Sequence, residues 1–270
     1  MVLFFTNQGR VYRLKGYEIP EYGRTAKGLP VVNLLKLTEG ENIQTIISLN
    51  QKEINEKSLF FTTRQGVVKR TSISEFANIR QNGLRALNLK EGDELINVLL
   101  TTGHDDIIIG TQFGYSVRFR EEVVRNMGRG ATGVKGITLR DGDQVIGASV
   151  ITDDQEVLVI TEKGYGKRTL ASEYPTKGRG GKGIKTANIT SKNGPLAGLV
   201  TVNGHEDIMI MTDTGVIIRT GISNISQTGR STIGVKVMRL DENAKIVTLA
   251  LIETEENDEE EKEKEVNEES

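Results

Sequence analysis

Residues 175–188 read Pro-Thr-Lys-Gly-Arg-Gly-Gly-Lys-Gly-Ile-Lys-Thr-Ala-Asn. From Lys177 to Lys185 this stretch contains four glycines and four cations, and it has no acidic or aromatic side chain. Because glycine permits positive φ and close backbone approach, such a loop can present N–H groups and cations to an anion. The stretch therefore predicts a phosphate-binding surface, with a mobile, solvated turn as the alternative. The candidate ligands in it are Lys177, Arg179, Gly180, Gly181, Lys182 and Lys185.

The same pattern recurs along the chain, which favours a functional interpretation over a solitary turn. Residues 23–28, 128–133 and 229–234 begin with Gly-Arg and end with Gly, as residues 178–183 do, and residues 80–85 form a degenerate copy. We refer to these five segments as the basic loops. Further candidate ligands in and beside them are Arg24, Lys27, Arg129, Lys135, Arg230 and Lys236.

A second repeated element precedes each basic loop. Short, continuous apolar runs such as Ile107-Ile108-Ile109 are typical of strands that are buried on both faces. A polar turn follows each run and contains a glycine, at Gly9, Gly66, Gly114, Gly164 and Gly215, which predicts a tight hairpin. Four residues after each of these glycines stands an arginine, so we expect five further anion contacts, at Arg13, Arg70, Arg118, Arg168 and Arg219.

The spacing of these elements predicts the fold. The hairpin glycines lie 57, 48, 50 and 51 residues apart, and a second hairpin signal such as Asp141-Gly142-Asp143 follows most basic loops. Each repeat therefore has about four strands, and apart from a possible helical turn in residues 73–79 no segment shows helical periodicity. Four strands in about fifty residues predict an all-β, propeller-like ring of about five four-stranded blades, because a β-solenoid has shorter repeats.

The charge is distributed unevenly. The chain has 35 Lys and Arg against 37 Asp and Glu, and residues 253–270 hold eleven of the acids but only two of the lysines. The tail has a net charge of −9, which leaves +7 for residues 1–252. We expect a folded basic domain at 1–252 and a disordered acidic tail at 253–270, because an acidic segment without aromatic residues buries too little apolar surface to fold.

Several classes of function are disfavoured by the residues themselves. The chain has no cysteine, no apolar run of membrane-spanning length and no P-loop, since Lys167 and Lys182 of its Gly-Lys pairs are followed by Arg and Gly. His104 and His205 stand in two similar turns, and together they supply too few ligands for a metal site. We therefore expect a non-catalytic, cytoplasmic protein without a cofactor, and because Leu3-Phe4-Phe5-Thr6 resembles a strand inside a repeat, we expect the natural protein to begin upstream.

Two motifs carry a family resemblance over residues 1 to about 252. The repeat Gly-x-x-x-Arg followed by Gly-Arg-x-x-x-Gly-[Val/Ile]-Lys, together with residues 164–169 and 174–177, resembles the C-terminal domain of the DNA gyrase A protein. The resemblance implies a β-pinwheel, usually of six blades, whose basic rim bends and wraps duplex DNA so that the holoenzyme can introduce negative supercoils. All the candidate ligands named above then become DNA-binding residues.

The resemblance also implies partners and one departure from the pattern. In that family, ATP, Mg²⁺ and the catalytic tyrosine belong to other parts of an A₂B₂ holoenzyme, which contains the gyrase A catalytic core and gyrase B and acts at the nucleoid. The family's box Gln-[Arg/Lys]-Arg-Gly-Gly-Lys-Gly belongs to the first blade. In this chain Arg179, Gly180, Gly181, Lys182 and Gly183 match it, but they belong to a later repeat and Lys177 stands at the Gln position.

Three alternatives remain open at this point. The corresponding domain of topoisomerase IV has the same fold and lacks a complete box, so it is the second candidate. A protein-interaction propeller would present exposed aromatic residues, but the chain has only thirteen Phe and Tyr. A propeller hydrolase would place paired carboxylates in a channel, whereas Asp141 and Asp143 occupy a turn where turn chemistry explains them.

Overall fold

The computed structural model describes residues 1–23, 25–50, 57–80, 82–241 and 243–252. The chain forms two compact units, one made of Met1–Thr152 with Pro175–Ile184, and the other of Asp153–Tyr174 with the chain from Lys185 onward. We call them unit 1 and unit 2. Arg24 and the acidic tail at 253–270 lie outside the described residues.

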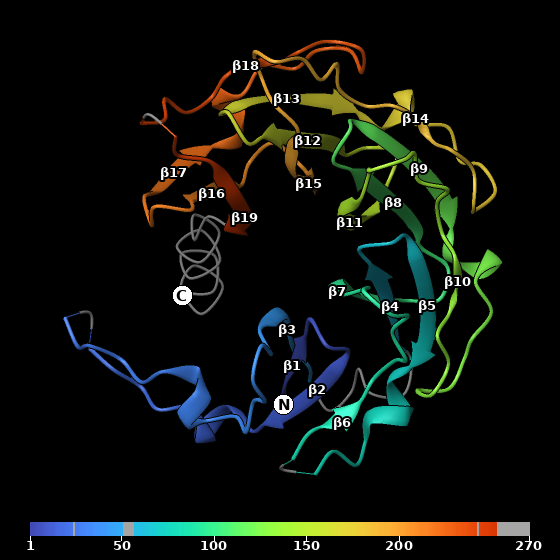
Figure 1. Cartoon of the computed structure of the whole chain (residues 1–270), viewed down its shortest axis with the longest axis vertical. Helices are drawn as coiled ribbons and strands as arrows, with labels where there is room; N and C mark the ends of the chain where they lie inside the picture. Colours follow the sequence, from blue (N-terminus) through green and yellow to red (C-terminus); the bar gives the residue numbers. More distant parts are fainter. Residues whose placement is uncertain (24, 51–56, 81, 242, 253–270) are drawn as a thin grey trace, which may run out of the picture. The chain divides into compact units, whose positions relative to one another are not determined.

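The first sheet of unit 1 is made by the start of the chain. Its strands β1 (Val2–Thr6) and β2 (Arg10–Leu14) form an antiparallel hairpin, and β3 (Ile43–Ser48) pairs with the other side of β1. The free edge of β2 pairs with β6 (Leu84–Arg85), a two-residue strand from the next repeat. The order across the first sheet is therefore β3-β1-β2-β6 (Figure 1).

The second sheet has the same plan. Strand β4 (Ser58–Thr63) lies between β5 (Val67–Ser72) and β7 (Leu95–Thr101), and all three are antiparallel. The fourth strand, β10 (Val134–Lys135), pairs with β5 and again comes from the following repeat.

The third sheet completes unit 1. Strand β8 (Asp106–Thr111) lies between β9 (Tyr115–Arg120) and β11 (Val145–Ile151). The fourth strand of this sheet is β14 (Ile184–Lys185), which the following repeat supplies.

The fourth sheet, in unit 2, repeats this arrangement. It contains β15 (Leu196–Val202), β12 (Glu156–Thr161) and β13 (Tyr165–Leu170), with β18 (Val235–Lys236) paired to β13.

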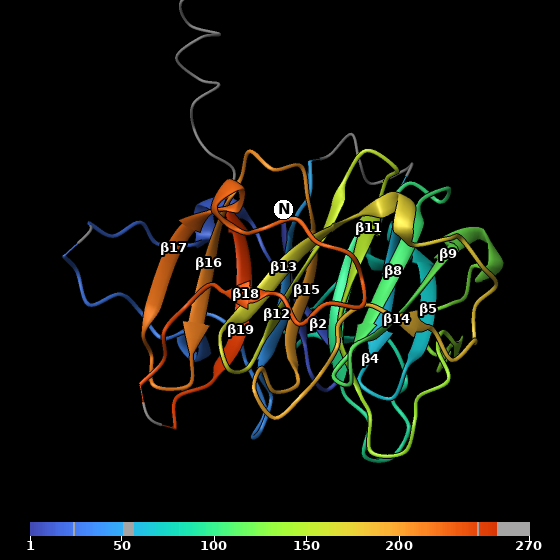
Figure 2. The ribbon, with the colours of Figure 1, turned by 90° about the horizontal axis from the view of Figure 1, so that it is seen from above.

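The fifth sheet has three described strands, β17 (Ile217–Gly221), β16 (Asp207–Thr212) and β19 (Ile246–Ile252), which lie side by side in Figure 2. Short 3₁₀ helices account for the described helical turns, at Gly16–Glu18, Val31–Asn33, Ile73–Phe76, Glu121–Val123, Ala171–Glu173 and Ile222–Asn224.

The prediction of an all-β chain built from repeated four-stranded blades is confirmed, and the structure adds an exchange of strands between repeats. In the first four sheets the fourth strand is supplied by the repeat that follows. A single hairpin is only marginally stable in water, so each sheet gains both a pairing partner and a covalent link to the next repeat. The basic loop lies immediately before this exchanged strand.

The hydrophobic cores lie between successive sheets within each unit. Phe5 of the first sheet and Phe61 of the second are fully buried and pack edge to face, with ring centroids 5.7 Å apart. In unit 2, Leu158 and Ile210 belong to one buried cluster. The prediction of strands buried on both faces is confirmed for Ile107, Ile108 and Ile109, which are all inaccessible to solvent. It is wrong for the last repeat, where Ile208 and Ile210 are buried but Met209 and Met211 are partly exposed.

The turn predictions are also confirmed. Gly164 has φ of +82°, and a Cβ there would lie 2.3 Å from the Met238 carbonyl oxygen, so the hairpin requires glycine. Asp143 Oδ1 accepts hydrogen bonds from the Phe113 and Gln144 N–H groups, which explains this acid by turn chemistry. The described residues include no helix that could span a membrane.

Candidate nucleic-acid interface

The entries to loops 128–133, 178–183 and 229–234 are fixed on the strand arginine of the preceding repeat. The N–H group of Lys177 donates to the Arg118 carbonyl at 2.8 Å, and Thr176 and Arg118 form an isolated parallel bridge. The N–H groups of Met127 and Thr228 donate in the same way to Arg70 and Arg168, both at 2.8 Å. The loops are thus positioned by backbone contacts that do not depend on their cations.

The exit of the loop requires its closing glycine. Gly183 has φ of +73°, and a Cβ built on it would lie 2.7 Å from the Ser116 carbonyl oxygen. Side chains rarely adopt such a φ, and the space is already filled by backbone. The closing glycine therefore lets the loop reach the sheet edge where β14 begins.

Loops 128–133, 178–183 and 229–234 each accept a hydrogen bond from the residue five positions after the closing glycine of the preceding loop. The Thr138 N–H group donates to the Gly181 carbonyl at 2.9 Å, and its hydroxyl donates to the Gly180 carbonyl. At the equivalent place one repeat earlier, the Asn88 side chain donates to the Gly130 carbonyl at 2.6 Å. In unit 2, the Asn188 N–H group donates to the Thr232 carbonyl at 3.0 Å. These bonds therefore hold each of the three loops, at an equivalent position, on the chain just beyond an exchanged strand.

Loop 178–183 presents cations without a carboxylate partner among the described residues. Lys177, Arg179 and Lys182 are exposed. The Arg179 guanidinium donates to the carbonyls of Val123 and Lys135, each at 3.1 Å, which orients it but leaves its charge unneutralised. This charge remains available to an anion, because carbonyl contacts do not cancel a formal charge.

The arginines of loops 128–133 and 229–234 have a carboxylate neighbour. Arg129 Nε lies 3.7 Å from Glu75 Oε2, and Arg230 Nε lies 3.7 Å from Glu173 Oε2. Both glutamates stand five residues after a strand arginine. The equivalent residue five positions after Arg118, which supports loop 178–183, is Val123. The charges of Arg129 and Arg230 are therefore partly screened by a glutamate, while the charge of Arg179 is not.

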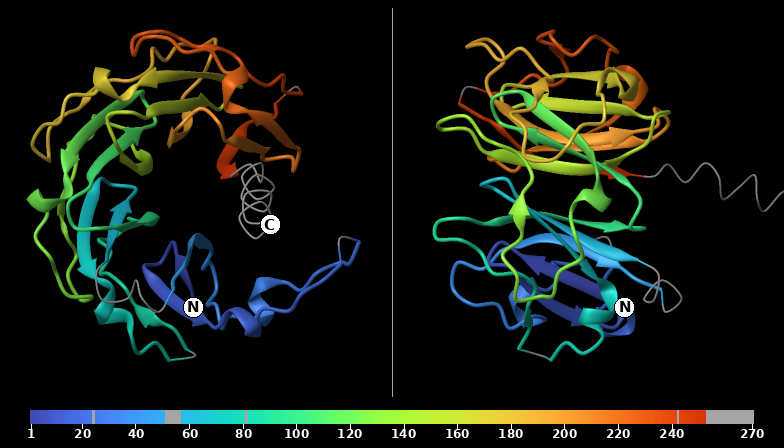
Figure 3. Two further views of the ribbon diagram at one scale, coloured as in Figure 1. Left: turned by 180° about the vertical axis from the view of Figure 1, so that it is seen from behind. Right: turned by 90° about the vertical axis from the view of Figure 1, so that its right-hand side faces the viewer.

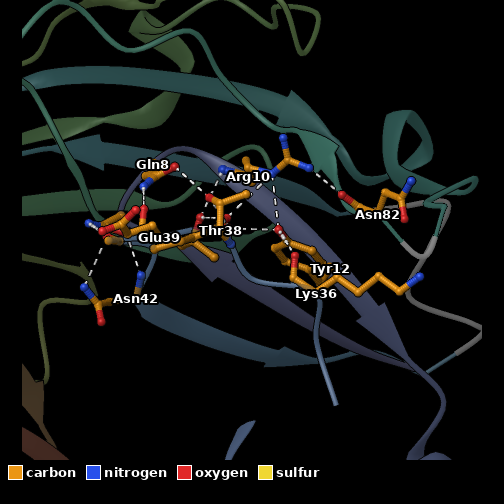
Figure 4. Close-up of polar contacts among 12 residues, drawn as sticks. Gln8, Arg10, Tyr12, Lys36, Thr38, Glu39, Asn42 and Asn82 are labelled. Atoms are coloured by element: carbon orange, nitrogen blue, oxygen red, sulfur yellow. Dashed lines mark hydrogen bonds and ion pairs between the residues drawn. The ribbon is translucent and has the colours of Figure 1, made fainter. Parts of the chain in front are cut away.

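The degenerate loop 80–85 is supported in a different way. Gly83 packs on the Tyr12 ring, and the Arg10 guanidinium donates to Asn82 (Figure 4). The Tyr12 hydroxyl lies 2.8 Å from Glu41 Oε2, and burial together with this carboxylate raises the pKa of Tyr12. This loop therefore shares the position of the others but not their Gly-Arg start.

The first repeat also presents a loop region with exposed apolar residues. The described chain on either side of Arg24, at 15–23 and 25–35, extends away from the first sheet in the left view of Figure 3. Lys27 is exposed, as are Tyr17 and Val32. Lys27 is therefore accessible to an anion, and its contact with DNA stays a prediction.

Lys185 and the remaining lysines beside the exchanged strands are exposed as well. Lys185 Nζ contacts Asn188 Oδ1 at 3.4 Å, and Lys236 Nζ lies 4.8 Å from the Tyr165 ring centroid. Lys135 is exposed at the end of β10. These three cations lie at equivalent places, one after each closing Gly-apolar pair, so the pattern read from the sequence corresponds to a structural position.

The five strand arginines, expected to contact DNA, all have partners within the protein. The Arg118 side chain is 6% exposed and pairs with Asp106 at 2.8 Å, and Arg168 pairs with Glu156 at 2.6 Å. Arg219 pairs with Asp207 at 2.6 Å and is 56% exposed. Arg13 donates to the Ala77 carbonyl and Arg70 to the Gly103 carbonyl. Their DNA contacts stay a prediction, but the geometry favours a structural role for the buried Arg118 and for Arg168, whose side chain is 17% exposed.

The sequence contained a signal for these ion pairs. In three repeats an acid stands twelve residues before the strand arginine, at Asp106, Glu156 and Asp207. The hairpin register pairs Ile108 with Arg118, so residues 106 and 118 become diagonal neighbours. The spacing after the hairpin glycine predicted the recurring arginines, but the acidic residues that pair with them were not predicted.

The two histidines are candidate metal ligands by residue type. Within the described ranges, no group of three or more His, Cys, Asp or Glu side chains could hold a metal ion. His104 is exposed and its Nδ1 lies 2.5 Å from Glu122 Oε1, which contributes to lowering the pKa of that carboxyl. The described histidines therefore occupy surface turns, as their sequence context indicates.

Comparison with known proteins gives one consistent family. The chain matches the family model described as DNA gyrase C-terminal domain, beta-propeller, over residues 1–50, 57–102, 105–152, 155–203 and 206–253. The DNA gyrase A protein of Streptococcus pyogenes serotype M1 is 77% identical over 256 residues, which is 95% of this chain and 31% of that protein. The corresponding protein of Streptococcus pneumoniae is 73% identical over 258 residues, covering 96% of this chain and 31% of that protein. The chain thus spans less than a third of the length of these curated relatives.

Two solved structures are similar over most of the chain. The C-terminal domain of DNA topoisomerase IV has a TM-score of 0.85 with 27% identity, and the match covers 93% of this chain and 79% of that one. A DNA gyrase A C-terminal domain has a TM-score of 0.81 with 23% identity, covering 93% and 82%. The second likeness is one of fold alone.

Proposed function

This chain belongs to the DNA gyrase C-terminal domain family, and on that premise we propose that it binds duplex DNA through the exposed cations of its basic loops. The observation that carries the proposal is the recurring set of hydrogen bonds that fixes loops 128–133, 178–183 and 229–234 at equivalent positions of their repeats. Loop 178–183, with exposed Lys177, Arg179 and Lys182, is the strongest single contact in this proposal.

The proposed contact is with the DNA backbone. Lysine and arginine side chains on exposed loops bind phosphates, which fix the position of a duplex but do not read its sequence. Bending a segment of 20 to 30 base pairs by 40 to 90° costs roughly 1 to 6 kcal/mol, so a curved path requires contacts at intervals. One loop per repeat supplies such intervals, and this supports bending and wrapping with little sequence preference.

The role within a larger protein is part of the same proposal. The relatives at 77% and 73% identity are DNA gyrase A proteins. We place this chain as the non-catalytic wrapping module of such a protein, acting with the gyrase A catalytic core and gyrase B in an A₂B₂ enzyme of the bacterial cytoplasm. ATP, Mg²⁺ and the catalytic tyrosine then belong to the parts outside this chain.

The test is the salt dependence of duplex binding by the 270-residue chain. If about eight phosphates are neutralised, log K falls with log salt at a slope near −7, and Lys177→Ala/Arg179→Ala/Lys182→Ala makes this slope shallower by about 2.7. The loss should be similar for duplexes of different sequence. Lys90→Ala, which removes an exposed cation from a hairpin turn, is the control. A wild-type slope near zero would rule out the electrostatic interface.

A second candidate function rests on the similarity to the topoisomerase IV domain. In that case the chain would bind DNA for decatenation or relaxation rather than for negative supercoiling. Measurement of plasmid superhelicity with the full-length parent enzyme and ATP separates the two, because only the gyrase role leaves the plasmid negatively supercoiled.

A further inference from the structure

A fully buried lysine lies beneath loop 128–133. Lys69 stands in β5, three residues after the hairpin glycine, and its side chain is inaccessible to solvent. Its Nζ donates to the carbonyls of Ala86 at 2.6 Å, Gly128 at 3.2 Å and Arg129 at 2.9 Å. A lysine is almost never buried without compensation. All three donors of this ammonium are therefore used to hold backbone, two of them at the start of the basic loop.

Unit 2 contains a second copy of this arrangement. Lys167 in β13 is also buried, and its Nζ donates to the carbonyls of Gly229 and Arg230, each at 2.6 Å. These are the residues equivalent to Gly128 and Arg129. The same buried contact at the same loop position in two separate units indicates that it serves the loop and is not an accident of local packing.

We propose that Lys69 and Lys167 are positioning residues of the DNA interface, which fix the first turn of loops 128–133 and 229–234. The inference rests on the proposed function. The ammonium draws the carbonyls of the Gly-Arg pair inward, and charge-assisted hydrogen bonds of this kind are about twice as strong as neutral ones. The arginine side chain then leaves from a fixed backbone, so less conformational freedom is lost when it binds a phosphate.

Titration of these lysines lies in an accessible pH range. Burial, with a smaller contribution from the Arg129 charge, lowers the pKa of Lys69 to about 8, and Glu75 partly opposes this shift. Burial likewise lowers the pKa of Lys167 to about 8, with Glu173 raising it and Arg230 lowering it. These arginines and glutamates are the charged groups that face each ammonium, and the arginines stay protonated throughout.

Raising the pH through the pKa of these lysines has opposite effects on folding stability and on DNA affinity. A lysine in the unfolded chain has a pKa near 10.4, so between about pH 8 and 10.4 the unfolded state binds more protons than the folded one. This group's contribution to folding stability therefore rises with pH. The hold on the loop weakens over the same range, because the neutral amine loses its charge and one donor. Affinity for DNA should therefore fall while the lysines' contribution to stability grows.

The experiment measures duplex affinity and the thermal midpoint Tm of the full chain from pH 7 to about 9.3 at constant ionic strength. We expect wild-type affinity to fall about three- to tenfold, because each neutral amine retains only weaker, uncharged hydrogen bonds to its loop. Lys69→Met/Lys167→Met should bind weakly at pH 7 and show a flat pH profile. Val117→Met, at the equivalent position under loop 178–183, should retain the wild-type affinity and profile.

The outcomes are distinguishable from failure of the proposed function. A wild-type chain without salt-dependent duplex binding would overturn the proposed function itself. A folded double variant with wild-type affinity and pH profile overturns the positioning role alone. If the double variant does not fold, the wild-type profile still decides, because an affinity that stays constant to pH 9.3 contradicts the inference.

Discussion

Loops 128–133 and 178–183 lie in the same unit and share the Gly-Arg start and the closing glycine. Each leads into an exchanged strand, yet different contacts hold the two loops in place. Loop 128–133 closes a turn on itself, since the Ala131 N–H group donates to the Gly128 carbonyl at 3.1 Å. Lys69 holds it from beneath and Glu75 lies beside its arginine. Its conformation is determined largely by charged groups of the preceding repeat.

Loop 178–183 lacks both charged supports. Val117 and Val123 occupy the positions of Lys69 and Glu75, and the Gly180 N–H group donates instead to the Gly136 carbonyl. Its backbone is supported by the segment just after the preceding loop, in which Arg140 also donates to the Lys182 carbonyl at 2.8 Å. The difference indicates a division of roles, in which one loop has a fixed shape with a screened arginine and the other has more uncompensated charge.

The largest expected effect concerns what the two loops share. A Cβ at Gly183 would lie 2.7 Å from the Ser116 carbonyl, and one at Gly133 would lie 2.4 Å from the Val68 carbonyl, both with positive φ. Gly183→Val and Gly133→Val should each lower the free energy of unfolding by about 3 kcal/mol or more, since backbone strain adds to overpacking. Urea denaturation measures this loss.

Gly178→Val is the matched control for the closing glycines. A Cβ at Gly178 meets no atom within 4 Å, and its φ is not positive. Its free energy of unfolding should stay within about 0.5 kcal/mol of wild type, as for most surface substitutions. If only one closing-glycine variant is destabilised, the two loops do not dock in the same way.

The fold was largely predictable because its turns depend on single residues. The hairpin glycines recur with the repeat, and only glycine suits their φ, so residues such as Gly164 mark each blade in the sequence. The exchange of strands was not predictable, because two-residue strands such as β10 have no periodicity of their own. A pattern of alternating or continuous apolar residues needs a longer segment to be recognised.

The candidate site was only partly predictable for a related reason. Exposed cations of the loops were correctly placed on accessible backbone, but a recurring arginine alone does not reveal its partner. Arg118 pairs with Asp106 through the hairpin register, and Lys69 is buried although its residue type suggests solvent exposure. Both roles depend on contacts between segments that are distant in the sequence or on the opposite strand.

The next prediction exchanges the screening carboxylate between the two loops. Glu75→Val should strengthen duplex binding by a factor of about 1.4 to 5, and Val123→Glu should weaken it by a similar factor, which corresponds to the roughly 0.2–1 kcal/mol of an exposed ion pair. Glu75 is exposed and Val123 is 46% exposed, so both changes are compatible with the fold. Affinities at low salt, where screening is weak, give the largest difference.

The double variant Glu75→Val/Val123→Glu completes this test. Its affinity should return close to that of wild type, because the sites are in different loops and their effects should add. Equal affinities for all four proteins at low salt would mean that the glutamate does not limit the availability of Arg129.

The smallest expected effect concerns how closely DNA approaches each loop. Gly181 and Ala131 occupy equivalent positions, and a Cβ at Gly181 meets no atom within 4 Å and needs no positive φ. Gly180, in contrast, has φ of +83°, so valine there would strain the loop and confuse the result. Gly181→Val should leave Tm unchanged but reduce DNA bending slightly, with less than about a twofold loss of affinity, because only van der Waals distance to the duplex changes. Ala131→Val should change bending less, since that loop already carries a side chain at this point. Fluorescence transfer between the labelled ends of a short duplex measures both, and equal bending by Gly181→Val and wild type would show that the glycine serves the turn and not the approach of DNA.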